Sequence, residues 1–448
     1  MNTKNKIFYW FKKILATLNN DKVRIALQQS IPFWIASVIT GLIAVFYTYL
    51  FGQAEYLLAW ITEKDHAWLF LITPLGFSLA YLIVNKWAPY AQGSGIPQLM
   101  ASIELATPKT SQKVDRLLSI RIIVVKIISS ILMVLSGGVI GREGPTIQIA
   151  GAVFRKINQW IPESWPKISR KNMIMTGGAA GLAAAFNTPL GGIVFAVEEL
   201  TKTHISYFKT ALFSAVIIAG LSAQAILGPY LYLGYPVLTN LNSSIFLPVA
   251  LVAIVSGLSG AALSKIILAF SKWKSSFKKQ FHFILYAFIG GLIMATLAYF
   301  ITPDILGSGK AQMKHILFTP DKKVEWYLPL LRMFGSLISF TSGAAGGIFA
   351  PALSIGATVG GVLGNLLELS ASNTNLLVLS GMVGFLTGVT RSPFTSAILV
   401  LEMTDRHSVI FYLMFSAIIS GASAYVIDRR SLYTHLKNRY LKEIEKNP

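Results

Sequence analysis

The sequence predicts an all-α polytopic membrane protein that contains two internal repeats. Three observations predict this class: its composition, its long apolar stretches, and motifs that occur twice. The 448 residues are 54% hydrophobic and only 13% charged, whereas soluble domains carry roughly a quarter charged residues. Such a chain has too little polar surface to cover itself in water. A membrane barrel would show alternating segments of about ten residues, and this sequence lacks them.

Ten apolar stretches are candidates for membrane spans. They are Ile31–Phe51, Trp68–Val84, Ile120–Ile140, Ile174–Val197, Ala211–Leu231, Ile245–Phe270, Phe283–Ile301, Leu328–Phe349, Leu376–Leu401 and Val409–Val426. Glycine, proline or a charge interrupts several of them, so unbroken spans of about twenty residues are not the rule. We therefore expect half-helices and irregular backbone at membrane depth, which persists only where protein or a water-filled cavity satisfies its polar groups.

The charge distribution predicts the placement of both ends. The net charge is +20, and much of it lies near the termini. Residues 1–30 are expected to form a basic amphipathic helix on the cytoplasmic surface, and 429–448 a short basic cytoplasmic tail. The positive-inside rule then requires an even number of crossings. A nucleic-acid interface would need a basic surface on a soluble module, which is absent, and the lack of cysteine excludes disulfides and thiol chemistry.

Three segments of the first half recur in the second half in the same order. "GSG" occurs at 93–95 and at 307–309. "SGGVIGREGPTIQIAGAV" from Ser136 aligns without gaps on "SGAAGGIFAPALSIGATV" from Ser342. "TGGAAGLAAAFNTPLGGIVFAVEE" from Thr176 aligns on "SGMVGFLTGVTRSPFTSAILVLEM" from Ser380. We infer a duplication, with 31–235 as the first transmembrane repeat and 236–428 as the second. In repeated transporters the binding site lies at the repeat interface.

Three stretches of the form Gly-x-x-x-Pro point to anion chemistry. They are "GSGIP" at 93–97, "GREGP" at 141–145 and "GIFAP" at 347–351. Proline suits the first helical position, glycine allows close approach of backbone, and a helix start collects unpaired N–H donors. Three such starts at mid-membrane would form an anion site from neutral groups, which bind moderately and so permit release.

Several polar side chains in these segments have more than one interpretation. A charge at the bilayer centre costs roughly 2.5–3.5 kcal/mol, so Glu143 is a functional candidate, although it could simply pair with Arg142. Ser94 offers a hydroxyl donor or a plain helix N-cap. Lys126 is an internal cation or, slightly favoured, an interfacial lysine that reaches towards water.

Two further candidates lie near the ends of spans. Glu198 and Glu199 end a span rich in glycine and alanine, where carboxylates could simply mark the membrane boundary. Tyr433 follows the last apolar stretch and, taken alone, is typical of an interfacial aromatic residue.

Together these segments resemble the CLC family of chloride channels and chloride/proton antiporters. The resemblance rests on "GSGIP" at Gly93, "GREGPTIQ" at Gly141, "GLAAAFNTPLGGIVFAVEE" at Gly181, "GGIFAPALSIG" at Gly346, "TRSPFTSAILVLEMT" at Thr390 and "LY" at Leu432. It implies two inverted halves of tilted, partly broken helices and a homodimer in which each subunit has its own pathway. It also implies a prokaryotic member in the cell's inner membrane, with chloride and protons as substrates, lipid as surroundings, and no cofactor or metal.

The resemblance also implies residue roles. The chloride-binding residues would be Ser94, Gly95, Ile96, Ile348, Phe349 and Tyr433. Glu143 would act as the external gate and proton carrier, and Glu199 as the internal proton-transfer residue. Ser94 favours chloride over nitrate, and the intact "GSGIP" with Tyr433 argues against fluoride export.

The function expected from these residues is secondary active exchange of chloride for protons. An ionised Glu143 would occupy the anion site itself, and a protonated one would leave it to chloride. A passive chloride channel is the alternative, which Glu199 disfavours, although Gln98 and Met100 replace acidic residues that support the inner proton path in some exchangers. A hydrolase is not expected, because G-x-S-x-G and H-E-x-x-H are absent and the histidines are scattered. The short tail after Tyr433 leaves no room for a CBS pair.

Overall fold

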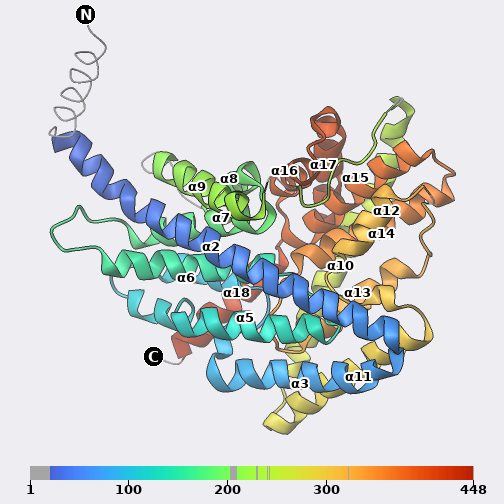
Figure 1. Cartoon of the computed structure of the whole chain (residues 1–448), viewed down its shortest axis with the longest axis horizontal. Coiled ribbons are helices and arrows are strands. Elements are labelled where there is room, and N and C mark those ends of the chain that lie inside the picture. The colour runs from blue at the N-terminus through green and yellow to red at the C-terminus, as the bar shows by residue number, and fades with distance from the viewer. Residues whose placement is uncertain are drawn as a thin grey trace, which may run out of the picture.

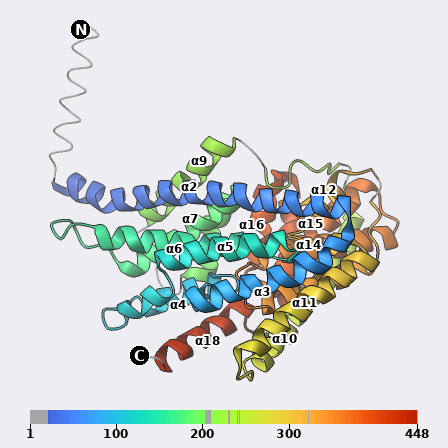
Figure 2. The ribbon, with the colours of Figure 1, turned by 60° about the horizontal axis from the view of Figure 1, so that its bottom comes forward.

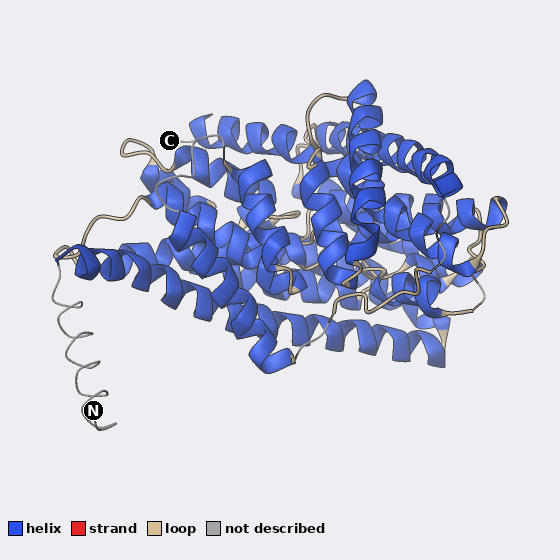
Figure 3. Cartoon of the chain, turned by 90° about the horizontal axis from the view of Figure 1, so that it is seen from above, coloured by secondary structure: helices blue, strands red, loops and turns tan. Residues whose placement is uncertain are grey.

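The chain folds into a bundle of helices in which the first half, from blue to green, lies beside the second half, from yellow to red (Figure 1). The computed structural model describes residues 21–201, 209–228, 231–239, 241, 243–320 and 322–446. Within these ranges the regular structure is helical, apart from two isolated β-bridges (Figure 3). The predicted N-terminal helix therefore lies largely outside the described residues, and the boundaries of the two repeats remain predictions.

The described residues of the first half form eight α-helices and a short π-helical turn. They are α2 (Asp21–Lys64), α3 (Leu69–Trp87), α4 (Ile96–Leu105), α5 (Ile120–Leu135), α6 (Glu143–Trp160), α7 (Arg170–Phe186), α8 (Pro189–Phe195), the π-helical turn Ala196–Leu200 and α9 (Lys209–Leu227). The long helix α2 crosses the whole first half diagonally and approaches α3 and α11 near its end (Figures 1 and 2).

The part of the second half that the structure describes forms nine α-helices. They are α10 (Phe246–Lys274), α11 (Gln280–Phe300), α12 (Lys310–Phe318), α13 (Leu328–Thr341), α14 (Phe349–Leu366), α15 (Ala371–Thr390), α16 (Pro393–Thr404), α17 (Ile410–Ile427) and α18 (Leu432–Lys446). The last helix turns back and packs against α4, so the end of the chain lies under the first half (Figure 2).

Eight helical segments among the described residues are long and apolar enough to cross a membrane. Large apolar side chains, such as Phe46, Leu247 and Phe411, are exposed on their outer faces. Such a surface is stable only against lipid or another apolar partner. The protein is therefore a multi-pass integral membrane protein, as its composition predicts.

Two of the predicted spans are each broken into two helices. Ile174–Val197 becomes α7 and α8, and Leu376–Leu401 becomes α15 and α16. Each break lies at a residue with left-handed backbone, Asn187 with φ 58° and Arg391 with φ 60°, two residues before the proline that begins the next helix. The residue before a proline avoids helical backbone, which explains why both copies of the repeat break at the same place.

The two halves cross at the centre of the molecule. Gly141 and Gly347, the first glycines of "GREGP" and "GIFAP", form an antiparallel bridge with N–H···O distances of 2.8 and 2.7 Å. Gly93 of "GSGIP" pairs with the segment just before this crossing, since its N–H donates to Ala344 at 2.8 Å. The antiparallel crossing of matching segments agrees with inverted halves, and the predicted fold class is confirmed.

Each half caps a broken helix of the other half with a carboxylate. Glu198 accepts from the backbone N–H groups of Phe394 at 3.2 Å and Thr395 at 2.7 Å, at the start of α16. Glu402, its repeat equivalent, accepts from Leu190 at 3.0 Å and Gly191 at 2.6 Å, at the start of α8. A negative charge is favourable at a helix start, so these bonds hold the short helices across the repeat interface.

Replacing one of these caps should destabilise the fold. Glu402→Ala leaves the N–H groups of Leu190 and Gly191 without their acceptor, and a lost charged hydrogen bond costs about 1–3 kcal/mol. We expect a lower thermal unfolding midpoint in detergent, with a smaller loss for Glu402→Gln, whose amide oxygen still accepts. The exposed Glu163→Ala serves as control. An unchanged midpoint for Glu402→Ala would show that the caps do not stabilise the halves.

Candidate functional site

The first part of the site is the loop that precedes α4. Gly93 and Gly95 have left-handed backbone, with φ 62° and 104°, which glycine adopts at little cost. Lys126 of α5 is fully buried, and its Nζ donates to the carbonyls of Ala91 and Gly93, both at 2.8 Å. Because Lys126 satisfies these two carbonyls, they can lie on one side of the loop. The Ser94 side chain can then lie on the other side.

Lys126 is therefore an internal cation, and the slightly favoured expectation of an interfacial lysine is wrong. Its exposure is 0%, so its amino group does not reach water at the membrane surface. The two backbone carbonyls replace the water that an interfacial lysine would keep, which offsets the cost of burying the charge.

The prolines of the three motifs do not occupy the first helical position. α4 begins at Ile96, α6 at Glu143 and α14 at Phe349, one or two residues before the proline. The expectation is wrong by this small shift because any of the first helical residues can lack an N–H without losing a bond. The helix starts themselves lie where the motifs predict them.

Two buried hydroxyls meet at the start of α4. Ser94 is 2% exposed and Tyr433, at the start of α18, is 0% exposed. The two hydroxyl groups face one another, yet neither oxygen makes a hydrogen bond within the described part of the chain. Buried hydroxyls normally have partners, so this pair indicates a place for a ligand. The interpretations of Ser94 as a plain N-cap and Tyr433 as an interfacial aromatic do not hold.

The start of α14 completes the lining of this place. The Phe349 ring lies parallel to the Tyr433 ring, with centroids 6.2 Å apart. Ile348 and Phe349 are both 1% exposed and provide the N-cap and first residue of the helix. Their backbone N–H groups belong to the first turn, where no intrahelical acceptor exists. Hydroxyls and helix-start N–H groups together form the type of environment that binds small anions.

Glu143 lies next to this place as the first residue of α6. The side chain is 1% exposed. Its Oε2 lies against Gly141 and faces the backbone amide of Ala350 in the first turn of α14. Its Oε1 accepts a long hydrogen bond of 3.4 Å from Tyr232. The carboxylate thus lies beside the same helix start that borders the two hydroxyls, and the charge of the neighbouring Arg142 acts on it as well.

A second carboxylate, Glu199, lies near enough to Tyr433 for its charge to act on the tyrosine. Glu199, in the π-helical turn Ala196–Leu200, accepts a hydrogen bond of 2.7 Å from Ser392. The neighbouring Glu198 caps α16, so the two adjacent glutamates have different environments, and a shared position at the membrane boundary does not explain them.

A small cavity connects Ser94 with the surface near the C-terminal helix. Its volume is about 60 Å3, and Lys274 and Arg439 are among the residues that line it. Gln98 also lines it and is held by bonds from its Nε2 to the carbonyl of Gln92 at 2.7 Å and the hydroxyl of Tyr440 at 3.2 Å. Two cations and a neutral amide at this mouth favour entry of an anion.

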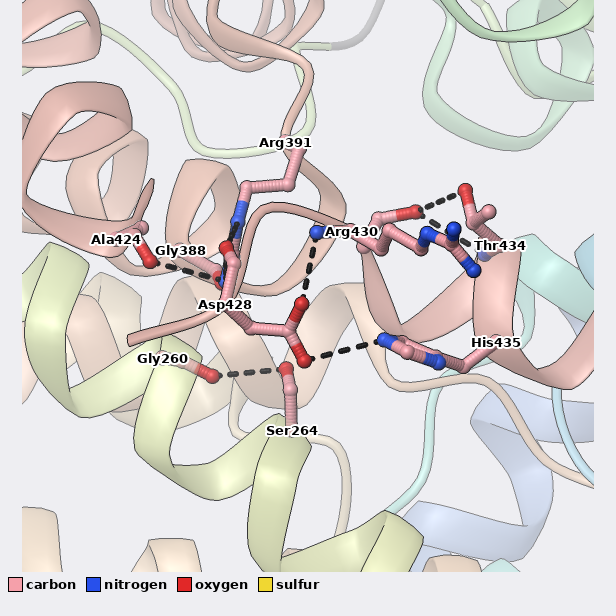
Figure 4. Close-up of polar contacts among 10 residues, drawn as sticks. Gly260, Ser264, Gly388, Arg391, Ala424, Asp428, Arg430, Thr434 and His435 are labelled. Carbon is pink, nitrogen blue, oxygen red and sulfur yellow. Dashed lines mark hydrogen bonds and ion pairs between the residues drawn. The ribbon is translucent and has the colours of Figure 1, made fainter. Parts of the chain in front are cut away.

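Polar contacts around Asp428 anchor the junction of α17 and α18, the helix that contains Tyr433 (Figure 4). His435 lies one turn along α18 and contacts Asp428 with a distance of 3.1 Å between Nε2 and Oδ2. Asp428 also accepts from the N–H of Arg430 at 2.8 Å, and its backbone carbonyl accepts from Arg391 at 3.1 Å. Burial raises the pKa of Asp428, but these donors and charges outweigh it and lower the pKa.

Two residues of the site were not among the candidates from the sequence. Ser392 carried a usable signal, because Thr188 occupies the equivalent position of the first repeat, and both hydroxyl residues precede a helix-starting proline. Tyr232 carried none, since it lies between α9 and α10 outside every motif. Only the tertiary structure brings its hydroxyl to Glu143.

The fold and the site define a membrane protein with a buried polar centre at the interface of two related halves. A family model described as "Voltage gated chloride channel" matches residues 76–425 of the chain. The chain belongs to this voltage gated chloride channel family, and its resemblance to CLC proteins is confirmed.

Known proteins similar to this chain span nearly its whole length. An "H(+)/Cl(-) exchange transporter ClcA" from Vibrio cholerae is 29% identical, covering 96% of this chain and 94% of its own length. A protein of the same description from Salmonella schwarzengrund is 28% identical, covering 98% and 96%.

Solved structures show the same fold. A slow cyanobacterial Cl−/H+ antiporter matches with a TM-score of 0.80 at 23% identity, covering 93% of this chain and 98% of its own. A CLC-type fluoride/proton antiporter matches with a TM-score of 0.74 at 20% identity, covering 90% and 96%.

The anchor of α18 should show in the pH dependence of stability. The lowered pKa of Asp428 means that its bonds stabilise the folded state above the ordinary pKa of 3.8, and that this contribution is lost as the pH falls through the lowered value. We expect Asp428→Asn to lower the thermal midpoint in detergent by the equivalent of about 1–2 kcal/mol at neutral pH, and the difference from wild type to shrink in acid.

Glu445→Gln, a neutralisation at an exposed position of the same helix, is the matched control. An equal change for both variants, or a difference from wild type that grows in acid, would contradict the assigned role of Asp428.

Proposed function

We propose that this protein exchanges chloride for protons across the membrane. The observation that carries the proposal is a carboxylate, Glu143, held at the start of α14 beside the unpartnered hydroxyls of Ser94 and Tyr433. When ionised, the Glu143 carboxylate can compete with a halide for the anion site. When protonated, it loses its charge and no longer competes. The similarity to relatives described as H(+)/Cl(-) exchange transporters supports the same function.

Chloride binds between the start of α4, the start of α14 and α18. Its ligands are the hydroxyls of Ser94 and Tyr433 and the backbone N–H groups of Ile348 and Phe349, and Gly95 and Ile96 line the site at the start of α4. No full positive charge contacts the ion there, so binding is moderate and release is fast enough for transport. These hydroxyl and N–H groups all donate hydrogen bonds, and chloride is a large monovalent anion that accepts them.

Glu143 couples the two substrates through charge competition. The ionised carboxylate and chloride repel each other and are both attracted to the amides at the start of α14. Protonation removes the charge of Glu143, so the side chain leaves and chloride enters. When the proton is released, the carboxylate returns and displaces chloride. Each cycle thereby links a proton movement to a halide movement in the opposite direction.

Glu199 transfers protons to the inner solution. Its charge acts on Tyr433 next to the chloride site, and its hydrogen bond with Ser392 orients the carboxylate at 2.7 Å. Gln98 lines the cavity that leads to Ser94. Its side-chain amide does not accept or release a proton near neutral pH, so it cannot relay protons. Protons therefore leave by Glu199 and chloride by the cavity with Lys274 and Arg439, so the inner routes are separate.

The proposed setting is the inner membrane of a prokaryotic cell, with both termini in the cytoplasm and two copies in a dimer. The basic residues at both ends support the orientation. Exposed apolar side chains on α17, which include Phe411 and Ile418 at 78% and 61% exposure, support a face that a second copy can cover. Chemical crosslinking in native membranes tests the dimer.

Glu143→Gln should separate the two fluxes. In vesicles with a chloride gradient and no proton gradient, wild type moves protons against their electrochemical gradient. Glu143→Gln cannot carry a proton on this residue, so we expect chloride flux to persist and coupled proton movement to fall to background. The external pH and chloride are recorded together, with Glu163→Gln as control.

The passive channel is the competing function, and the same recording decides it. Chloride flux without proton movement in wild type would identify a channel. Proton movement that survives in Glu143→Gln would overturn the coupling role of Glu143 while leaving exchange itself in place.

Ser392→Ala should slow protons more than chloride. It removes a hydrogen bond to the charged Glu199, which is worth about 1.5–3 kcal/mol, and leaves the chloride ligands untouched. We expect a several-fold lower proton rate with more chloride moved per proton, and recovery in Ser392→Thr. Ser396→Ala, whose hydroxyl donates to the carbonyl of Ser392 at 2.8 Å, is the control for local packing. Equal slowing of both ions would assign Ser392 a structural role instead.

A further inference from the structure

The second half of the chain contains a counterpart of the loop that carries Ser94. "GSG" at 307–309 precedes α12 as "GSG" at 93–95 precedes α4. Its glycines adopt the same left-handed backbone, with φ 69° at Gly307 and 86° at Gly309. The loop is therefore the same turn, built a second time, and it presents Ser308 in place of Ser94.

The cation that holds the loop is also repeated. Arg332 lies 206 residues after Lys126, the same offset as between Ser136 and Ser342 in the ungapped repeat. It is 0% exposed, and it donates to the carbonyls of Asp304 at 2.7 Å, Leu306 at 3.4 Å and Gly307 at 3.2 Å. As in the first half, a buried basic side chain binds carbonyls of the loop. The N–H of Gly307 donates to Gly137 at 3.5 Å, so the donors that face Glu55 are the N–H and the hydroxyl of Ser308.

A carboxylate lies at the position that a small anion would take. Oε1 of Glu55, from α2, accepts from the Ser308 hydroxyl at 2.5 Å and from the Ser308 backbone N–H at 3.2 Å. A serine hydroxyl also lines the place between Ser94 and α14, and the N–H of Ser308 is a backbone donor from the loop two residues before α12. Glu55 thus has the relation to Ser308 that a halide would have to Ser94.

The surroundings contain donors that Glu55 does not use. A cavity of about 550 Å3 borders the loop and is lined by Glu55, Ser308, Lys310, Gln312 and Arg332 among others. Nε of Arg332 and Nε2 of Gln312 are buried and make no hydrogen bond within the described residues. Unpaired buried N–H groups are costly, and an anion or water in this cavity would satisfy them.

The cavity is lined by three carboxylates, two permanent cations and a histidine. Glu63 and Asp304 line it with Glu55, and Lys310, Arg332 and His66 line it on the basic side. Arg332 makes no ion pair within 4 Å among the described residues, and its charge acts at longer range with Asp304 and Glu55. Once the charge of Glu55 is removed from the loop, the buried guanidinium of Arg332 and the amino group of Lys310 remain as cations in the lining of the cavity.

We propose that the loop Gly307–Gly309 is a second site for a small monovalent anion such as chloride, and that Glu55 is its tethered competitor. A halide that displaces Glu55 binds to the hydroxyl and N–H of Ser308, with Arg332 behind the loop. The displaced carboxylate swings into the adjoining cavity. None of its donors is a proposed ligand of the exchange site, so this proposal stands whether or not Glu143 couples protons.

The site is connected to the gate by contacts. Lys310, the first residue of α12, lies over the ring of Tyr232 with its Nζ 4.4 Å from the centroid. Tyr232 in turn donates to Glu143 at 3.4 Å. An anion at Ser308 adds negative charge near Lys310, so occupancy at this site can alter the contact that holds the gate carboxylate.

Removal of the competitor should expose the site to direct detection. Crystals of wild type, Glu55→Gln and Glu55→Gln/Ser308→Ala are soaked in bromide, and anomalous difference maps are compared. We expect a bromide peak beside Ser308 in Glu55→Gln, a weak one or none in wild type, and none in the double variant. Glu63→Gln, which removes a charge from the same cavity without contact to Ser308, should match wild type.

Calorimetric titration with chloride supplies the affinity. Glu55→Gln should bind chloride at a second site at least about tenfold more tightly than wild type, which corresponds to about 1.4 kcal/mol, while Ser94→Ala affects only the first site. The proposal is overturned if Glu55→Gln, with an unchanged thermal midpoint, shows no bromide at Ser308. It is also overturned if the peak persists in the double variant, because the ion would then be adventitious.

Discussion

The structure depends on one constraint: irregular backbone inside a membrane must find partners for its polar groups within the protein. Both "GSG" loops meet it with a buried cation. Lys126 binds carbonyls of the first loop at 2.8 Å, and Arg332 binds those of the second at 2.7 to 3.4 Å. Neither side chain reaches the solvent. Because the cations collect the carbonyls on one side, the N–H groups and hydroxyls collect on the other. A membrane protein thereby obtains an electropositive surface from neutral groups, with the full charges one layer behind it.

The same constraint explains how the two halves hold together. Helices that break at Asn187 and Arg391 leave new helix starts at membrane depth, and each start needs an acceptor. Glu198 and Glu402 supply these acceptors across the repeat interface, each to the other half. The crossing of Gly141 with Gly347 adds backbone pairs at the centre. The frame around the candidate site is therefore fixed by charged and backbone hydrogen bonds. Among the described residues, the Glu143 side chain has a long hydrogen bond from Tyr232 and lies near the charge of Arg142 and the amide of Ala350. A side chain held less firmly than its frame is suited to move.

Function in such a duplicated protein arises where the halves differ. The repeat position of Glu143 is occupied by Phe349 in the second half, so one helix start carries an acid and the other an aromatic ring that stacks on Tyr433. The two serines also differ: the Ser94 hydroxyl makes no hydrogen bond among the described residues, and Ser308 holds the carboxylate of Glu55. The same local geometry has thus been combined with different neighbours. The turn presents a serine hydroxyl in both halves, and in the second half a carboxylate from another helix accepts from it.

The sequence by itself determined the membrane class, the repeat and the approximate positions of the helix starts, because hydropathy, glycine and proline act locally and are readable along the chain. Its resemblance to a known family also pointed to Ser94, Glu143, Glu199 and Tyr433 as candidates, although their spacing along the chain spans more than 300 residues. What only the tertiary structure decided is which groups meet. The burial of Lys126, the bond from Ser392 and the reach of Glu55 to Ser308 depend on how helices from distant segments pack. No local pattern encodes such contacts, since each is set by the relative position of two helices and not by either helix alone.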